Sequence, residues 1–433
     1  MTENYSPMQK HLYKHKSDIF KTIIISYSTR IGGAGIAADN FRRLLNDDIA
    51  NYQVGVISQD KSGINHIFKR LVSFILSKLQ FDGNPTKHSL NLFSFKPVIN
   101  SFMKDKDTIH HIHWINNDTL SIFDFDKVPS GSVITLHDEW LYCGSEHHYK
   151  LFDESNDFKS SYSYFKHGVF GIHWNYIIWS IKNRKLFQRK DLIYTVPSQW
   201  MMDRAKSSAM LKNSEIYLLP NPIDTNLFKR SSESEIGLFK SKLNLDVDYF
   251  IITFNKFIGN KNKLKGIEIL EETFQLLESK NLTIPQSKIV LIDFGGKKGD
   301  CEYNGFRNIS LGEIDNHEYL AKLYSSSDCV IVPSMVESFG QVAAEALSCS
   351  TPVVSFNTSG LKDIVIHNHT GMVAESFSAK SLCDQIVELI NTPPNDRSKM
   401  GNNGREHVIN NFSYKVIQKK YINILDKAKH FKK

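Results

Sequence analysis

The fold of this chain is decided by the stretch Pro333-Ser-Met-Val-Glu337-Ser-Phe-Gly340-Gln-Val-Ala-Ala-Glu345-Ala-Leu347. A short apolar run, Cys329–Val332, precedes this stretch and is typical of a buried strand, whereas Gly340 begins an amphipathic helical pattern. At the start of such a helix, the unpaired backbone N–H groups and the helix dipole favour an anion. The unit therefore predicts a phosphate-binding site at the end of a parallel strand.

Two carboxylates, Glu337 and Glu345, flank the start of this helix. In isolation, the spacing is explained more simply by one acidic residue at a helix N-terminus and one solvated residue on the helix surface. Glu345, however, lies within the small and apolar stretch from Val342 to Leu347, where a solvated carboxylate is not expected. We therefore interpret both carboxylates as acceptors for hydroxyl groups next to the phosphate.

Short runs rich in β-branched residues alternate with helical stretches in both halves of the chain, a pattern typical of parallel α/β sheets. The domain boundary is expected at 219–224, where Pro220 and Pro222 disfavour both a helix and a central strand. We predict two Rossmann-like, doubly wound domains that face a cleft, 1–219 and 220–412, followed by a helix over 413–433. The expected strands are 21–27, 52–57, 108–114, 132–136, 192–196, 249–254, 287–292, 329–332 and 351–355; a glycine turn is expected at 32–35 and helices at 36–45, 266–280 and 340–348.

The composition is that of an ordinary globular protein. The 433 residues are 41% hydrophobic and 23% charged, which excludes wholesale disorder. No apolar run is long enough to span a bilayer, and the first 18 residues lack the apolar core of a secretory signal. The five cysteines form no CxxC pair. We therefore expect a cytoplasmic chain with reduced thiols.

Positive charge is concentrated in the first half: basic residues exceed acidic ones by six over 1–220 and by one over 221–433. Two segments, 68–81 and 166–190, mix aromatic and basic residues, which is typical of a peripheral contact with an anionic membrane. Ordinary helices with a charged outer face explain the same pattern equally simply. No nucleic-acid-binding motif is present, so we expect no nucleic-acid partner.

The spacing of Glu337 and Glu345 resembles the E-x7-E motif of GT-B retaining glycosyltransferases of family 4 of the glycosyltransferase classification. The likeness extends in register over about residues 21–425 and is similar to a subgroup that includes colanic-acid-type enzymes of polysaccharide biosynthesis. By the same resemblance, the helix after Ser413 packs back on the first domain. The further matching segments are Gly32–Gly35, His113–Asn116, Thr135–Trp140, Pro197–Trp200, Pro220–Phe228, Lys265–Gly266, Thr351–Pro352, Ser359–Gly360 and Thr370–Gly371.

The resemblance implies a metal-independent hexosyltransferase that needs no cofactor besides its donor substrate, a UDP- or GDP-sugar. The acceptor would be an oligosaccharide or a lipid-linked glycan at the cytoplasmic face of the inner membrane. Glu345 would bind the ribose and Glu337 the transferred sugar, while Lys265 would neutralise the diphosphate and His137 would face the sugar from the first domain. The remaining expected contacts are Gly33, Gly35, Lys256, Phe339, Gly340 and Gln341 to the donor, and Asp138, Trp140 and His113 to the acceptor.

The chain departs from the family in two places. An arginine that many members carry about five residues before the lysine is absent here, and Lys256, Lys261 or Lys263 would replace it as point charges. Ser359-Gly360 stands where a pair of glycines is common. The missing arginine keeps a non-catalytic binding subunit open as an alternative, and a nucleotide-sugar epimerase on the same architecture is another.

Three further patterns have simpler explanations. Residues 33–38 match the G-x-G-x-x-A fingerprint of NAD binding, but the strand ends too far before Gly33, and Asp60 is the nearest acidic candidate. His111 and His113 share a strand face and suggest a metal pair, but no third ligand is evident, so we expect a structural role. The D-x-D at 124–126 precedes a strand and is expected to be a solvated loop.

Overall fold

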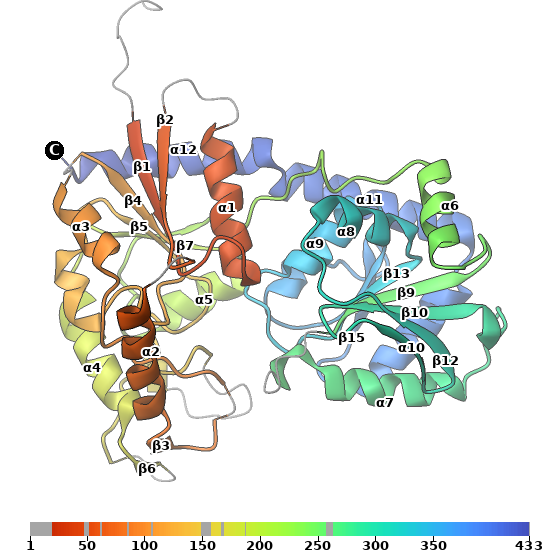
Figure 1. The fold of residues 1–433 in the computed structure, drawn as a ribbon, viewed down its shortest axis with the longest axis horizontal. Coiled ribbons are helices and arrows are strands. Elements are labelled where there is room, and N and C mark those ends of the chain that lie inside the picture. The colour runs from red at the N-terminus through yellow and green to blue at the C-terminus, as the bar shows by residue number, and fades with distance from the viewer. Residues whose placement is uncertain are drawn as a thin grey trace, which may run out of the picture.

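The computed structural model describes residues 20–46, 52–60, 63–84, 86–104, 107–148, 157–165, 169–186, 188–256 and 263–432. It contains two α/β domains that lie side by side, with the first half of the chain in one and most of the second half in the other (Figure 1). Lys261, residues 1–18 and parts of the segment 166–190 lie outside the described residues.

The first domain is built on a six-stranded, wholly parallel sheet with the order β2-β1-β4-β5-β7-β8. The strands β4, β5 and β7 are short and fully buried, as expected where helices cover both faces of a sheet. The strands are β1 (Phe20–Ile25), β2 (Tyr52–Ile57), β4 (Ile109–Ile112), β5 (Val133–Thr135), β7 (Ile193–Val196) and β8 (Ile216–Leu218).

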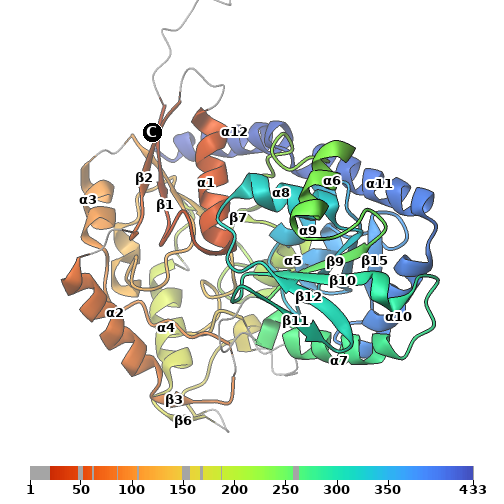
Figure 2. The ribbon, with the colours of Figure 1, turned by 45° about the vertical axis from the view of Figure 1, so that its right-hand side comes forward.

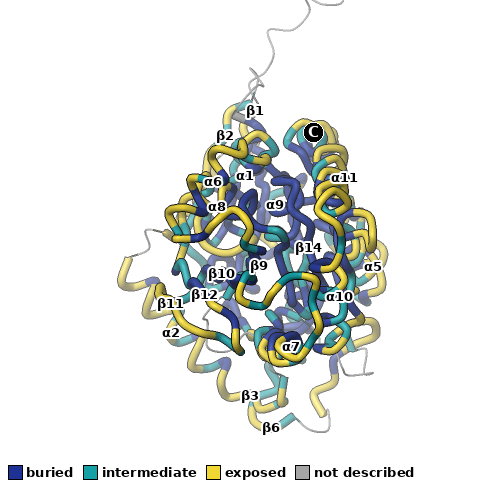
Figure 3. Tube along the Cα trace, turned by 90° about the vertical axis from the view of Figure 1, so that its right-hand side faces the viewer, coloured by how far each residue is buried: buried dark blue, intermediate teal, exposed yellow. Residues whose placement is uncertain are grey.

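The second domain holds a seven-stranded sheet with the order β11-β12-β10-β9-β13-β14-β15, in which only the edge strand β11 is antiparallel to its neighbour. Its central strands are buried, and exposed residues lie on the helices and loops around them (Figure 3). The strands are β9 (Phe250–Asn255), β10 (Ile289–Phe294), β11 (Gly299–Tyr303), β12 (Phe306–Ser310), β13 (Cys329–Val332), β14 (Val353–Phe356) and β15 (Gly371–Ala374).

Helices cover both sheets, as Figure 2 shows from a second direction. Several begin at a serine or asparagine whose side chain accepts a hydrogen bond from the first turn; α6, for example, has a complete capping box from Ser232 to Glu235. The helices are α1 (Gly32–Asn46), α2 (Ile64–Ser77), α3 (Lys96–Lys104), α4 (Trp174–Leu186), α5 (Gln199–Ser207), α6 (Glu233–Lys242), α7 (Ile267–Glu278), α8 (His317–Ser326), α9 (Gln341–Ser348), α10 (Ala379–Asn391), α11 (Pro394–Phe412) and α12 (Tyr414–His430).

The predicted fold class is confirmed, including the return of the last helix to the first domain. Ile417, Tyr421 and Leu425 of α12 pack into one apolar cluster with Ile24 of β1 and Phe41 of α1. The chain thus passes between the domains twice, at 219–224 and at 412–414. The two passages are joined by a hydrogen bond of 2.8 Å from the N–H of Ile223 to the carbonyl of Phe412.

The local predictions differ from the structure in two respects. The glycine turn expected at 32–35 is the first turn of α1, which begins at Gly32. Strands β8, β11, β12 and β15 and the two-residue strands β3 (Gln80–Phe81) and β6 (Phe170–Gly171) are not among the predicted strands. In β11 and β12 the many polar residues hide the strand pattern. In the described part of the chain, none of the helices combines the length and apolar character that crossing a bilayer requires.

Gly131 offers a test of how closely α12 packs on the first domain. Its φ is +69°, and a Cβ at this position would overlap the carbonyl oxygen of Ala428 in α12. We expect Gly131→Ala to reduce the free energy of unfolding by about 2 kcal/mol or more, because it adds backbone strain and displaces the helix. Denaturant titration would measure this loss. The control is Gly237→Ala in α6, where the added Cβ meets no atom; equal stabilities of the two variants would contradict the packing argument.

Candidate functional site

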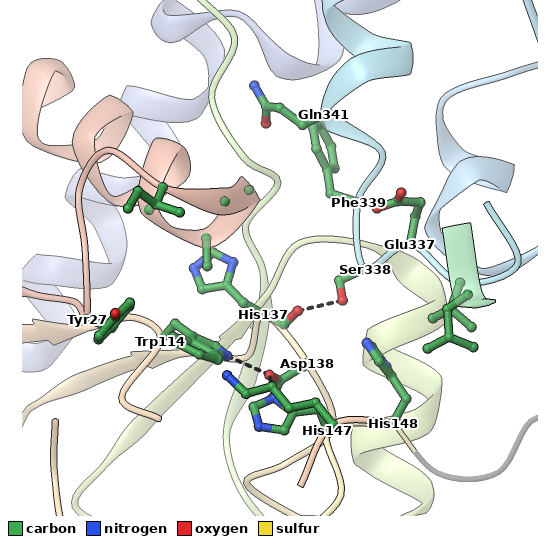
Figure 4. A pocket seen from close by; sticks show the side chains of 18 of the residues that line it. Tyr27, Trp114, His137, Asp138, His147, His148, Glu337, Ser338, Phe339 and Gln341 are labelled. Atoms are coloured by element: carbon green, nitrogen blue, oxygen red, sulfur yellow. Dashed lines mark hydrogen bonds and ion pairs between the residues drawn. The ribbon is translucent and has the colours of Figure 1, made fainter. Parts of the chain in front are cut away.

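A cleft of about 820 Å³ lies between the two domains and is lined by residues from both (Figure 4). The first-domain wall comes from the loops that follow β1, β4 and β5 and from the first turn of α1. The second-domain wall comes from Leu264, Lys265 and the segment Val336–Gln341, and Asn221 of the linker lies between the walls. The carboxyl ends of parallel strands in both domains therefore face one space, where α/β sheets bind ligands.

The start of α9 presents unpaired backbone donors to the cleft. Gly340 is the N-cap, and the first hydrogen bond of the helix runs from the N–H of Ala344 to the carbonyl of Gly340. The N–H groups of Gln341, Val342 and Ala343 therefore have no acceptor within the helix. Because Gln341 lines the cleft, these donors and the positive end of the helix dipole form a surface suited to an anion.

Lys265 and Glu337 meet on this wall. The Lys265 ammonium lies 2.5 Å from a carboxylate oxygen of Glu337, and both side chains are partly exposed. Gly266, with a φ of +69°, allows this approach, because a Cβ there would overlap the carbonyl oxygen of Pro333. Ser359 holds the other side of the loop by accepting a hydrogen bond of 2.9 Å from the N–H of Glu337. The structure thus places a cation and a carboxylate next to the anion-binding helix start.

His137 follows β5 and faces this wall from the first domain. Its carbonyl accepts a hydrogen bond of 2.6 Å from the hydroxyl of Ser338, which joins the two walls directly (Figure 4). Nε2 of its ring lies 2.8 Å from Nδ1 of the buried His113. Burial lowers the pKa of His137 to about 4, despite the opposing charge of Asp138, so the imidazole is neutral at pH 7.

Asp138 anchors a second cluster on the same wall. Its carboxylate accepts hydrogen bonds from Nε1 of Trp114 at 2.7 Å and from Nδ1 of His147 at 2.6 Å. Burial alone would raise the pKa of Asp138, but the interactions with His147, His148 and Trp114 lower it overall. Burial also lowers the pKa of His147 to about 4, so at neutral pH an ionised Asp138 accepts from an uncharged imidazole.

Most of the predicted site residues do meet in this cleft. Those that line it are His137, Asp138, Gly33, Gly35, Lys265, Glu337, Phe339, Gly340 and Gln341. Glu345, Lys256, His113 and Trp140 do not line it. His113 lies behind His137, and Trp140 is a core residue that is 1% exposed and donates to the carbonyl of Ser89. The structure therefore does not bring these two residues into the cleft.

Glu345 lies one helical turn below the cleft wall and is 5% exposed. Its carboxylate accepts a hydrogen bond of 2.8 Å from the amide of Gln341, which separates it from the cleft. Burial raises the pKa of Glu345 to about 7, although the hydrogen bond from Gln341 opposes the shift. The carboxylate reaches the cleft only if the Gln341 side chain moves aside.

The predicted replacements for the absent arginine do not reach the cleft among the described residues. The ammonium of Lys256 lies 4.9 Å from the ring centroid of Tyr303, and Lys263 is exposed in the short helical turn Lys263–Lys265. Of the described cations, Lys265 lines the cleft from the second domain and Lys78 and Lys87 from the first. Lys265 is thus the described cation next to the start of α9.

Several lining residues were not assigned to the site from the sequence, although some follow a strand directly, as His137 does. They include Ser26, Tyr27, Lys87, Trp114, Asn117, His147, His148, Asn221 and Ser338. Lys87 lies with its ammonium 4.4 Å above the ring centroid of Trp114 and donates to the side chain of Asn117. Strand ends were the available signal for Ser26, Tyr27 and Trp114, and Ser338 lies inside the motif between Glu337 and Gly340, whereas tertiary folding brings in the others.

The residues of these further patterns have structural partners, and the D-x-D pair lies in a short helical segment and not in the expected loop. Both ring nitrogens of His111 are engaged, Nδ1 with the hydroxyl of Tyr421 at 2.6 Å and Nε2 with the hydroxyl of Thr135 at 2.8 Å. Across the described ranges, no three His, Cys, Asp or Glu residues are grouped so that they could hold a metal ion. Asp60 accepts hydrogen bonds from Ser28 and Ser58 and does not line the cleft.

The D-x-D pair at 124–126 also lies away from the cleft. Asp124 accepts from Ser94, Asp126 pairs with Lys185, and both lie in the short helical segment Ile122–Lys127.

The burial of Glu345 predicts a specific dependence of stability on pH. Burial raises the pKa of Glu345 to about 7 in the folded state, whereas an exposed glutamate loses its proton near pH 4.5, so the free energy of unfolding falls as the pH rises through that interval. Glu345→Gln should remove this loss of stability. Its free energy of unfolding should exceed that of the wild type by up to about 3 kcal/mol at pH 8, and the two should be similar at pH 4. Unfolding titrations across this range would measure the difference. The control is Glu406→Gln on the exposed side of α11; parallel profiles for all three proteins would refute the burial argument.

Comparison with known proteins shows what part of the chain is similar to a described family. Residues 239–407 match the family model described as Glycosyl transferases group 1. Similar curated proteins include an uncharacterized glycosyltransferase of Methanocaldococcus jannaschii, 30% identical over 188 residues that cover 43% of this chain and 51% of that protein. The capsular polysaccharide biosynthesis glycosyltransferase CapM of Staphylococcus aureus is 25% identical over 247 residues, 56% of this chain and 63% of CapM. The matched part thus spans less than two thirds of either relative.

Solved structures resemble the whole chain in fold. Sucrose-phosphate synthase from Thermosynechococcus elongatus superimposes with a TM-score of 0.65 at 19% identity and covers 94% of this chain and 98% of its own. Anabaena HepE, solved in complex with UDP and glucose, gives a TM-score of 0.61 at 16% identity over 94% of this chain and 100% of its own. The two domains therefore form a GT-B fold, and residues 239–407 are similar to the glycosyl transferases group 1 family.

Proposed function

We propose that this chain is a metal-independent, retaining glycosyltransferase that moves a hexose from a UDP- or GDP-sugar to a glycan acceptor in surface polysaccharide biosynthesis. The observation that carries the proposal is the meeting of three groups in one cleft. The start of α9 and the Lys265–Glu337 pair belong to a group 1 domain, and His137 faces them from the first domain. Such a site suits a donor in which a diphosphate joins the nucleoside to the sugar.

The negatively charged diphosphate of the donor binds at the start of α9, next to Lys265. Its oxygens accept from the backbone N–H groups at the start of α9 and bind the Lys265 ammonium, which now pairs with Glu337. Glu337 is then free to accept hydrogen bonds from hydroxyl groups of the transferred sugar. Glu345 accepts from the ribose once the Gln341 amide has turned away from it.

The reaction exchanges one glycosidic bond for another on the same face of the sugar. The bond from the anomeric carbon to the phosphate oxygen breaks, and its electron pair stays on the phosphate. The acceptor hydroxyl oxygen bonds the anomeric carbon, and its proton passes to the departing phosphate oxygen. Lys265 and the helix N–H groups stabilise the negative charge that develops on the leaving group. A neutral His137 contributes a polar ring at the sugar and no net charge.

The relatives support a nucleotide-sugar donor. HepE has been crystallised with UDP and with UDP-glucose, and CapM is described as a glycosyltransferase of capsular polysaccharide biosynthesis. On this basis we place UDP first among the nucleotides to test, followed by GDP. A glycan acceptor of a surface polysaccharide agrees with the description of CapM.

The donor site is tested by thermal shift with UDP, GDP, ADP, CMP and NAD. A nucleoside diphosphate present at 100 times its Kd adds about 2.7 kcal/mol of stability and raises the Tm of the wild type. Lys265→Ala and Glu345→Ala should lose most of this shift, because they remove the diphosphate and ribose contacts, whereas Lys399→Ala on the exposed side of α11 should keep it. Stabilisation by NAD alone, or by no nucleotide, would overturn the proposal.

The role of His137 is tested by separating turnover from binding. We expect His137→Ala to lower the rate of nucleotide release from the donor, measured with a panel of glycan acceptors, by about a hundredfold. The reason is that the His137 side chain faces the transferred sugar and not the nucleotide. Its nucleotide-induced thermal shift should stay that of the wild type. His430→Ala, at the exposed end of α12, is the control. Wild-type turnover in His137→Ala would show that this residue has no role in catalysis. Product formed from the donor alone would favour an epimerase.

A further inference from the structure

Helix α2 is packed with its polar side inward and its apolar side outward. The residues that it buries are His66, Ser73 and Ser77. Its large apolar side chains recur at helical spacing along the opposite side and are exposed, with Ile64 at 84% and Phe68 at 65%. The exposed set on this helix is Ile64, Ile67, Phe68, Leu71, Phe74 and Ile75. This arrangement is the reverse of that expected for a helix on a globular domain.

Specific interactions fix this orientation. The hydroxyl of Ser73 donates to the buried carboxylate of Asp118 at 2.9 Å. Arg70 donates to the hydroxyl of Tyr27 at 2.9 Å and lies 4.9 Å from the centroid of that ring. Nε1 of Trp174 donates to the carbonyl of Leu76 at 2.7 Å. Rotating the apolar side inward would break all of these bonds, so the outward orientation belongs to the fold.

The exposed apolar surface continues beyond the helix. Two short strands, β3 (Gln80–Phe81) and β6 (Phe170–Gly171), pair beside the end of α2 and lie at the same end of the first domain (Figures 1 and 2). They carry exposed Phe81 and Phe170, and Phe165 nearby is 86% exposed. We call this surface the α2 face, defined as Ile64, Ile67, Phe68, Leu71, Phe74, Ile75, Phe81, Phe165 and Phe170.

The charged residues within the described range 63–81 are all positive: Lys69 and Lys78 are exposed, and Arg70 is turned toward Tyr27. Nearby carboxylates are engaged by other residues. Asp60, before the helix, is exposed but accepts from Ser28 and Ser58, Asp118 is buried behind the helix, and the Asp82 side chain is 8% exposed and accepts from Gln80. An apolar helix surface whose own charges are all positive is typical of binding in the interface of an anionic bilayer.

The second basic segment does not share these properties. Lys182 is fully buried and donates to backbone carbonyls, Lys185 pairs with Asp126, and Arg189 pairs with Asp191. Lys182 and Lys185 of helix α4 are thus engaged, whereas Arg184 is exposed. Of the two segments, the exposed apolar surface lies in the first and, from the second, includes Phe170 of the α2 face.

We propose that the α2 face docks the protein on the surface of an anionic phospholipid bilayer. The apolar side chains would enter the boundary between head groups and acyl chains, and the exposed Lys69 and Lys78 would bind the head-group phosphates. A second copy of this chain is a poorer occupant, because a two-fold contact through the face brings two sets of like charges together. A bilayer supplies both the apolar environment and the opposite charge.

Docking places the mouth of the cleft at the membrane. Phe74 and Lys78 belong to the same helix and also line the cleft, so the α2 face borders its mouth. Given the proposed function, on which this consequence rests, the acceptor would be an amphiphile. Its glycan enters the cleft while its apolar part remains in the bilayer. The docking itself does not depend on the identity of the nucleotide or sugar.

The test is flotation of the purified full chain with phosphatidylglycerol vesicles. The wild type should float with these vesicles, less so at high salt, and weakly with phosphatidylcholine alone. The double variant Phe68→Glu/Leu71→Glu should reduce the bound fraction about tenfold or more, because it puts carboxylates into the apolar surface. Neither residue lines the cleft. Leu238→Glu in α6, which is 59% exposed in the second domain, is the matched control and should float like the wild type.

Two further measurements make each outcome decisive. Light scattering on the wild type and the double variant reports their oligomeric state; a wild-type dimer that the variant dissociates would assign the face to a second copy and overturn the proposal. Absence of wild-type flotation, or equal flotation of the double variant, would overturn it as well. The nucleotide-induced thermal shift of the double variant should equal that of the wild type, so failure of docking and failure of the proposed function are distinguishable.

Discussion

The close approach of two backbone segments in the second domain determines the rest of the site. The left-handed turn at Gly266 lies directly against the carbonyl of Pro333, at the end of β13. This contact brings Lys265 to Glu337 and holds both next to the unpaired N–H groups of α9. A cation and a helix N-terminus attract the same anion strongly only when both lie close to it, because water screens their charges at longer distances.

The second domain alone forms half of a site. The other half depends on how the chain passes between the domains, once at 219–224 and again at 412–414, with α12 packed into the first domain. Two separate connections and the bond from Ser338 to the carbonyl of His137 set the position of the two walls relative to each other. A ligand that contacts both walls would draw them together, which is the usual way for a two-domain enzyme to exclude water from its reaction.

Local sequence patterns predicted the elements whose signal is strong. The strand Cys329–Val332 followed by α9 lies where its apolar run and helical spacing placed it, and His137 stands at the end of β5 as predicted. Trp140, only three residues further along, turns into the core and donates to Ser89. Nothing in the local pattern separates the two directions, because a loop after a strand can turn either way. Lys256 likewise follows a strand end, yet it lies over Tyr303.

By itself the sequence determined the two-domain α/β fold, the helix start that suits an anion, and the amphipathic character of α2, because each depends on the spacing of residue types along the chain. The tertiary structure decided which groups share a cleft and which side of α2 faces the protein. Asp118, Tyr27 and Trp174 are distant in sequence, and their bonds with α2 turn its serines inward and leave its phenylalanines outside. An amphipathic pattern states that a helix has two sides; only the partners that folding brings to it decide which side is buried.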